Sequence, residues 1–385
     1  MKDSPVDSVA TPKVAIDWYR TAPWWRFASQ CIVISWRSTH LMLCAAALLL
    51  TQLWTSSSAW IFGPDDSAMQ SWISPSAPSQ SVWIQALTGQ STELPLSVWQ
   101  RFSFPVYQWL SNPTLSGTAF CISSMIGIIA IWSFVGGCLT RRSVVELGTN
   151  MTAPWDETIQ LVLTRCQSIV WSVTMPSGLI LMLGLVPLVL GWLSNIPWIG
   201  VWLAGLLMVP VVLLSIGIGW CAAITLFGFP LSVCSIVTEK GADAYDGISR
   251  SAAYTFQRPM TLAICLIASG FLSAIGGAYL TIVLSIGLRV VEAGFDIGSF
   301  SSIEKLESVW GPVLRGIVPL LLSAYGFSFF WTASSATYLI LRREVDHAEF
   351  DLIDMGDQVT KTLPELPKKD ELAPSSESDL ANTAE

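Results

Sequence analysis

The chain has 385 residues, of which 52% are hydrophobic and only 12% are charged. A soluble protein carries about a quarter charged residues, so the composition excludes an ordinary soluble fold and indicates a protein buried mainly in lipid. The net charge of −8 arises in the tail, because residues 344–385 hold twelve acids and three lysines while the other 343 residues carry a net charge of +1. No basic face is left for nucleic acid, and we expect no nucleic-acid partner.

The eight cysteines and two histidines show no pattern of a metal or catalytic site. No two cysteines have C-x-x-C spacing, and all lie in or beside apolar segments, as small buried hydrophobic residues do. His40 and His347 are far apart in the sequence, which argues against a histidine-based metal site or triad. We expect no cofactor and no metal.

The N-terminal segment, residues 1–37, is polar and then amphipathic. Apolar residues recur at helical spacing from Trp24 to Trp36, which predicts a short helix lying in the membrane interface. Residues 41–62 carry no charge and are long enough to cross a bilayer. The polar stretch before them is too long for an ordinary signal peptide, so we expect an uncleaved anchor.

Five further apolar segments predict a domain of six spans over residues 38–343. An outer loop, 63–113, holds Leu96, Trp99, Phe102 (or Phe104) and Tyr107 at the spacing of a second interfacial helix. Arg141-Arg142 closes the second span, and an amphipathic helix with Asp156 and Gln167 on its polar face follows from Pro154. The expected spans are 41–62, 115–139, 171–193, 198–238, 260–288 and 312–341. The tail, 344–385, is acidic and rich in Pro, Ser and Glu, and we expect it to be disordered and cytoplasmic.

The bases favour one orientation. With six crossings, eleven bases fall on one side of the membrane. The positive-inside rule identifies that side as the cytoplasm, with both termini inside. These bases are Arg20, Arg26, Arg37, Arg141, Arg142, Arg165, Lys240, Arg250, Arg258, Arg342 and Arg343. Two crossings within the 41-residue run 198–238 would place Lys240, Arg250 and Arg258 outside, so we expect one over-long crossing. It would bend at Pro210, at Gly217 or Gly219, or at Gly228–Pro230.

The segment after this run predicts a second amphipathic helix, Gly241–Pro259. Its helical wheel places Tyr245, Ile248, Ala252 and Phe256 on an apolar stripe, and Asp243, Asp246, Arg250 and Gln257 on the polar face. Asp246 and Arg250 have the i, i+4 spacing of an ion pair. The polar face, with Arg258, Asp156 and Gln167, is the candidate interaction face for a cytoplasmic protein or a lipid headgroup. The alternative is a solvated face that only fixes how the helix docks.

The two amphipathic helices suggest an internal repeat. Trp155-Asp156 and Gln167 match Tyr245-Asp246 and Gln257 at one offset of ninety residues. In both places the expected order is span, surface helix, span, which indicates two parallel repeats. The fifth span also carries small residues on adjacent helical lines, Ser269/Ser273/Gly277 and Gly270/Ala274/Ala278, which predict close packing of helices.

Three sequence passages carry a resemblance to a known family. Gly241–Pro259, Phe134-Val-Gly-Gly137 and Tyr338-Leu-Ile-Leu-Arg-Arg-Glu-Val-Asp346 resemble uncharacterised multi-pass membrane proteins of planctomycete bacteria, over residues 132–350. More distantly, the long span and its following helix resemble the membrane domain attached to some glycerophosphodiester phosphodiesterases, whose catalytic domain has no counterpart here. The resemblance implies a bacterial inner membrane and brings no activity or catalytic residues.

The sequence therefore predicts an all-α fold, a polytopic membrane helix bundle of about six transmembrane helices with amphipathic cytoplasmic surface helices. Acid–base catalysis and proton-driven transport are disfavoured, because the central parts of the six spans hold no Asp, Glu, Lys or His. Tyr245-Asp246 resembles the pair of intramembrane aspartyl proteases, but the partner Gly-x-Gly-Asp is missing. We expect a non-catalytic binding or membrane-organising role; the alternative is a permease or lipid-handling protein for a neutral or lipid-like substrate.

Overall fold

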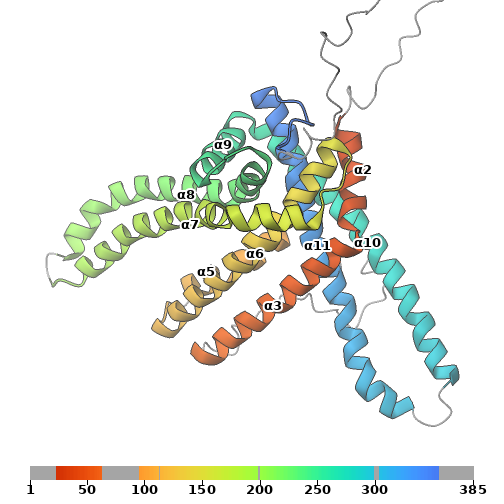
Figure 1. Cartoon of the computed structure of the whole chain (residues 1–385). Helices are drawn as coiled ribbons and strands as arrows, with labels where there is room; N and C mark the ends of the chain where they lie inside the picture. Colours follow the sequence, from red (N-terminus) through yellow and green to blue (C-terminus); the bar gives the residue numbers. More distant parts are fainter. Residues whose placement is uncertain (1–22, 63–94, 112, 198–199, 299–302, 355–385) are drawn as a thin grey trace, which may run out of the picture. The chain divides into compact units, whose positions relative to one another are not determined.

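A computed structural model describes residues 23–62, 95–111, 113–197, 200–298 and 303–354. Within these ranges the chain is helical and contains no strand, which confirms the all-α prediction. The chain divides into two units, 1–352 and 353–385, and the helices lie in the first (Figure 1). They are α2 (Pro23–Ser35), α3 (Ser38–Phe62), α5 (Pro95–Ser111), α6 (Leu115–Thr149), α7 (Trp155–Ser194), α8 (Gly200–Thr238), α9 (Ala244–Gln257), α10 (Pro259–Gly298) and α11 (Ile303–Asp346).

Six of the described helices, α3, α6, α7, α8, α10 and α11, are long and apolar enough to cross a membrane. This finding confirms a multi-pass membrane protein. We call the end at which α3, α7 and α10 begin and α6, α8 and α11 finish the charged end, because ion pairs and hydrogen bonds of charged side chains join these helices there. One example is the contact of Arg37, just before α3, with Glu146 of α6, at 2.5 Å.

The second span continues beyond Arg141-Arg142, which was expected to close it. Helix α6 runs on to Thr149 and ends at Asn150, which adopts a left-handed conformation with φ of 59°. Both arginines are buried: Arg141 donates to the backbone carbonyl of Val237 in α8 at 2.9 Å, and the Arg142 guanidinium lies 4.0 Å from the centre of the Trp155 ring. The pair therefore fastens α6 to α8 and α7 instead of facing a headgroup layer.

The amphipathic helix from Pro154 and the third span, predicted as two elements, form the single helix α7 of 40 residues. The long uncharged run forms one unbroken helix from Gly200, as expected of a single crossing; residues 198 and 199 lie outside the described part. Figure 1 shows α7 and α8 side by side as a curved pair. Internal prolines, which remove backbone donors, account for such curvature: Pro176 and Pro187 in α7, Pro210 and Pro230 in α8.

The last two spans are longer than predicted. Helix α10 begins at Pro259 and extends to Gly298, so it includes Glu292 and Asp296 of the expected linker. Helix α11 begins at Ile303 and includes the remaining linker charges, Glu304, Lys305 and Glu307. The prediction placed the outer boundaries of both spans near charged residues, because it followed the apolar runs alone. A helix continues past the hydrocarbon layer for as long as its backbone hydrogen bonds continue.

Helix α2 was predicted as an interfacial helix, and a helix is found, but its apolar face packs on protein. Phe27, Cys31 and Ile34 are buried against α10 and α11. The Arg26 guanidinium donates to the carbonyl of Leu147 at 2.9 Å. The helix therefore fastens the chain before the first span to the end of α6.

The helix predicted around Leu96–Tyr107 forms as α5 but is not interfacial. Val98, Arg101, Phe102 and Pro105 are buried, and α5 packs against α6, α10 and α11. Arg101 is 7% exposed, with its guanidinium 5.9 Å from the centre of the Phe327 ring. A charged side chain thus lies among the spans, contributed by a segment that the sequence assigned to the outer loop. The rest of that loop, residues 63–94, lies outside the described residues.

Aromatic rings hold α5 in place. The rings of Trp99, Phe102, Trp132, Phe229, Phe327, Phe330 and Trp331 form the aromatic cluster. Phe102 lies edge-to-face with Trp132 at 5.5 Å, and Trp132 stacks on Phe327 at 4.4 Å. Such pairs add about 0.5–1.5 kcal/mol each beyond the area they bury. The cluster joins α5, α6, α8 and α11 into the core.

We predict that Gly136→Ala destabilises the protein, because a Cβ there would lie 2.4 Å from the Trp331 ring in the buried core. The expected cost is about 1–3 kcal/mol, typical of an overpacked core. Gly184→Ala in α7 is the matched control, since nothing lies within 4 Å of its added Cβ. Thermal melting of the purified protein in one detergent compares the two; equal melting temperatures would contradict the packing described here.

Candidate functional site

Helix α9 docks on α8 through its smallest residues. Ala244, Gly247 and Ser251 are buried, and a Cβ at Gly247 would lie 2.9 Å from the side chain of Ile236 in α8. The Ser232 hydroxyl donates to the Ser251 hydroxyl at 2.8 Å. Small residues let two helix backbones approach closely, so this face fixes α9 against α8.

The helix predicted over Gly241–Pro259 forms as α9. Within its predicted apolar stripe, Tyr245 is 72% exposed, whereas Phe256 is 40% exposed and stacks at 4.5 Å on Trp220 of α8. One of the two largest residues of the stripe thus lies against α8, and the other is open. The face that the protein buries consists of small and hydroxyl-bearing residues together with Tyr254.

A carboxylate at the end of α8, that of Glu239, joins three helices at the charged end. Its Oε2 lies 2.5 Å from Nη1 of Arg250 in α9, and its Oε1 accepts a hydrogen bond of 2.9 Å from the Tyr338 hydroxyl in α11. Nε of Arg342, also in α11, lies 3.9 Å from the same Oε1. Because the Glu239 and Arg342 side chains are only 10% and 8% exposed, each neutralises a charge that would otherwise be buried alone.

Two more contacts complete this arrangement, which we call the Glu239 network. Arg165 of α7 donates from Nη1 to the backbone carbonyls of Ile236 and Glu239, both at 2.5 Å. Cations at a helix C-terminus stabilise its unpaired carbonyls. The Tyr254 hydroxyl of α9 donates to the Asp346 carboxylate at the end of α11. The network therefore ties α7, α9 and α11 to the end of α8.

Burial and charge act on the two titratable side chains that α9 contributes. Burial raises the pKa of Tyr254, and its hydrogen bond to Asp346 raises it further, so the phenol stays protonated and donates. Burial by itself lowers the pKa of Arg250, but the Glu239 carboxylate together with Tyr254 and Tyr338 outweighs that effect, and the pKa is raised. Both groups are thus held in the protonation states that bond them to their neighbours.

The structure gives the predicted face residues different roles. Asp243 is the N-cap of α9, and its carboxylate accepts a hydrogen bond of 2.8 Å from the backbone N–H of Asp246. Arg250 pairs with Glu239 and not with Asp246, which corrects the predicted i, i+4 pair. All seven residues of the predicted face are exposed: Asp243, Asp246, Arg250, Gln257 and Arg258 around α9, and Asp156 and Gln167 on α7.

Helices α7 and α9 are neighbours. Within the described residues, however, Asp156 and Gln167 make no hydrogen bond or ion pair with α9. The two halves of the repeat also differ: the first surface segment continues into its span as α7, whereas α9 ends at Gln257 and α10 starts at Pro259. Proline lacks the N–H that a continuous helix needs, which explains the break.

Sequence reasoning missed Glu239, Tyr338, Arg342 and Arg165. Two signals were available: Glu239 is the first charge after the 41 uncharged residues, and Tyr338 and Arg342 have the i, i+4 spacing of one helix face. Neither signal identifies the partner, because the contacts cross between helices that are about 75 to 105 residues apart.

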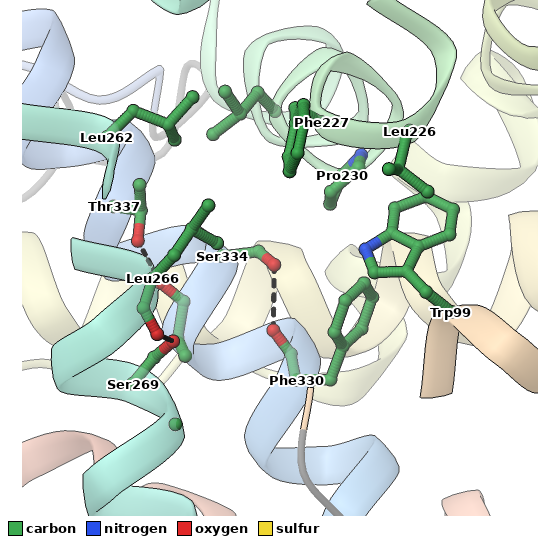
Figure 2. Close-up of a pocket in the computed structure, with 13 residues that line it drawn as sticks. Trp99, Leu226, Phe227, Pro230, Leu262, Leu266, Ser269, Phe330, Ser334 and Thr337 are labelled. Carbon is green, nitrogen blue, oxygen red and sulfur yellow. Dashed lines mark hydrogen bonds between the residues drawn. The ribbon is translucent and has the colours of Figure 1, made fainter. Parts of the chain in front are cut away.

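A cavity of about 250 Å³ lies between α5, α8, α10 and α11 (Figure 2). Ten of its thirteen lining residues have apolar side chains or none, and among these ten the indole N–H of Trp99 is the one polar side-chain group. The other three, Ser269, Ser334 and Thr337, donate their hydroxyls to carbonyls of their own helices at 2.8 Å. Figure 2 shows these bonds beside the cavity, and no hydroxyl proton is left to donate to a ligand.

A second cavity of about 190 Å³ lies between α2, α10 and α11, with Ser269, Ala333 and Thr337 common to both. The predicted small-residue lines of α10 therefore have two uses. Ser273 and Gly277 of these lines are buried. Beside them, at Gly276, which belongs to neither line, an added Cβ would lie 1.9 Å from the Tyr325 hydroxyl of α11, so the helices pack closely there. At Ser269 and Gly270 they part and leave space.

We predict that Glu239→Ala lowers the free energy of unfolding by about 3 kcal/mol, because it leaves the buried Arg342 charge without its partner. Asp246→Ala, on the exposed side of α9, is the control, and should change stability by less than about 0.5 kcal/mol. Chemical or thermal unfolding in detergent measures both. If Glu239→Ala proved as stable as the control, the Glu239 network would not hold these helices together.

In the part of the chain that the structure describes, no three His, Cys, Asp or Glu side chains are grouped so as to hold a metal ion. No protein-family model matches the chain, and neither a curated protein nor a solved structure matches it. Its function is therefore argued from the Glu239 network, the exposed faces of α7 and α9, and the cavities.

Proposed function

We propose that this protein is a non-catalytic membrane-organising protein that binds a cytoplasmic protein through the exposed faces of α9 and the first part of α7. One observation carries the proposal: α9 is fixed by its buried small residues, by Arg250 and by Tyr254, so its outer face has a single orientation. A surface that is ordered before binding loses less conformational entropy when a partner docks.

The chemistry of the exposed faces favours a protein partner over a lipid headgroup. Tyr245 is exposed beside the carboxylate of Asp246, and Gln257 follows at the end of α9. Aromatic side chains surrounded by polar groups are typical of protein interfaces. The faces mix acids with bases and offer no cluster of bases to the anionic lipids of a cytoplasmic leaflet; their charged residues are Asp156, Asp243, Asp246, Arg250 and Arg258.

The proposed location is a bacterial inner membrane, with the charged end and both termini in the cytoplasm. The positive-inside rule supports this orientation, because ten bases of the described residues gather at the charged end. They are Arg26, Arg37, Arg141, Arg142, Arg165, Lys240, Arg250, Arg258, Arg342 and Arg343. The resemblance of Gly241–Pro259 to planctomycete membrane proteins supports the bacterial inner membrane.

A second function, lipid handling, is favoured by the cavities. A permease for a neutral polar substrate would need a polar path among the spans, whereas the larger cavity has an apolar lining and its hydroxyl protons are engaged. Of the two substrate classes in this alternative function, the cavities therefore favour a lipid-like ligand over a neutral polar one.

We predict that Asp246→Ala/Gln257→Ala weakens capture of the cytoplasmic partner about tenfold without changing stability, because both side chains are exposed and make no contact across helices. Crosslinking in cells followed by mass spectrometry of the purified protein measures the capture. Glu349→Ala/Asp351→Ala, two exposed acids after α11, is the control. An identical set of captured proteins in all three forms would refute the proposed face.

We also predict that alkaline phosphatase fused after Gln80 is active and fused after Asp246 is inactive, because the enzyme's disulfides form only outside the cytoplasm. Fusion after Asp351 should be inactive as well, since α11 ends at the charged end. Activity at Asp246 would place α9 outside and overturn the orientation, and with it the cytoplasmic partner.

A further inference from the structure

The larger cavity has the size and lining of a site for one hydrocarbon chain. Its volume of about 250 Å³ falls below the roughly 300–1,000 Å³ typical of pockets that enclose whole small molecules. The wall of the cavity is mainly apolar and includes Leu226, Phe227, Leu262 and Phe330. The three hydroxyl groups in the wall already donate their protons to backbone carbonyls, so none is free to bond a polar ligand. A flexible apolar chain satisfies these walls, whereas a polar molecule would lose its hydrogen bonds to water on entry.

The position of the cavity matches the depth of an acyl chain. It follows α10 from Leu262, the fourth residue of the helix, to Gly270, which is about 12 Å at 1.5 Å per residue. This length lies within one half of a hydrocarbon layer of about 30 Å. Leu266, at the edge of the cavity, is 39% exposed, so the site is open on the outer side of α10.

A cation, that of Arg258, lies one helical turn before the cavity along the chain. The backbone N–H of Leu262 donates to the carbonyl of Arg258 at 3.1 Å, which places Arg258 one helical turn before the lining. Arg258 is exposed, and among the described residues its guanidinium has no ion-pair or hydrogen-bond partner. The neighbouring acids are engaged: Glu344 accepts from Thr261 at 2.8 Å, and Asp346 accepts from Tyr254.

We propose that this cavity binds one acyl chain of an anionic phospholipid whose headgroup lies against Arg258. The apolar wall selects a chain, and the free guanidinium selects negative charge, which it attracts at the membrane surface. The cavity itself lies between α5, α8, α10 and α11, outside the face of α9 that we propose for a protein partner, and it can fill with or without that partner. Arg258, next to Gln257, borders both sites.

Two substitutions on α10 test the chain site. Gly270→Phe should fill the cavity, because Gly270 lines it and has nothing within 4 Å of an added Cβ. Gly287→Phe is the matched control, since it also has open space but lies farther along the same helix, outside the lining. Both should melt at the wild-type temperature in detergent.

The measurement is native mass spectrometry of the full chain from nanodiscs of equal phosphatidylethanolamine and phosphatidylglycerol, with stepwise removal of lipid. Wild type and Gly287→Phe should retain a phosphatidylglycerol that Gly270→Phe loses about tenfold more readily, as expected for a blocked site. Equal retention by Gly270→Phe and Gly287→Phe would overturn the proposal, as would a second copy or a peptide retained in place of lipid.

Arg258→Gln tests the headgroup contact, with Lys240→Gln as the charge-matched control at the same end of the bundle. Arg258→Gln should still retain one lipid, but its preference for phosphatidylglycerol should fall about fivefold, the effect of one basic side chain at a membrane surface. An undiminished preference in Arg258→Gln, or an equal fall in Lys240→Gln, would overturn the role of Arg258.

Discussion

The buried carboxylate of Glu239 is the interaction on which the arrangement of the spans depends. Lipid tails are as apolar as leucine side chains, so apolar burial does not by itself drive helices together within a bilayer. Close packing and polar contacts must supply the specificity. Glu239 receives Arg250 from α9 and Tyr338 and Arg342 from α11, and its backbone carbonyl receives Arg165 from α7. One residue thus joins the ends of four helices.

The aromatic cluster complements this network deeper among the helices. It admits α5, a helix of 17 residues that by itself is too short to be counted among the spans. Trp99 and Phe102 of α5 lie against rings of α6, α8 and α11, and Trp109 near its end donates to Thr118 in the first turns of α6 at 2.8 Å. The main buried core of the described residues is therefore built from the five long helices α3, α6, α7, α8 and α11 and from one short helix, α5, which brings Arg101 among the spans.

The apolar runs predicted the spans because each run is long enough to cross the hydrocarbon layer. The boundaries of the spans were predicted wrongly where a charged residue was taken as the end of a helix. Arg141 and Arg142 resembled a stop at the membrane surface and are instead buried against α8 and α7. The wheel of α9 separated an apolar stripe from a polar face but did not identify the residues that pack on protein. These include small ones such as Gly247, which let α9 approach the neighbouring helix closely.

The candidate face was predicted in part. Exposure of Asp246, Gln257, Asp156 and Gln167 followed from periodicity, which is a local property. The pairing of Arg250 with Glu239 did not follow from periodicity, because Glu239 lies before the turn at Gly241. The i, i+4 spacing predicted Asp246 as the partner instead. The Glu239 network and both cavities are formed by helices that are distant in the sequence. Predicting them requires the relative positions of whole helices, which composition does not give.

The difference between the two repeats has a mechanical consequence. In α7 the segment with Asp156 and the apolar span form one continuous rod, so any tilt of the span swings the exposed segment with it as a lever. In the second repeat the chain is interrupted at Arg258–Pro259, which uncouples α10 from α9. The surface segment of the first repeat is thus part of its span, whereas α9 is separate from its following span and is held by α8 and α11.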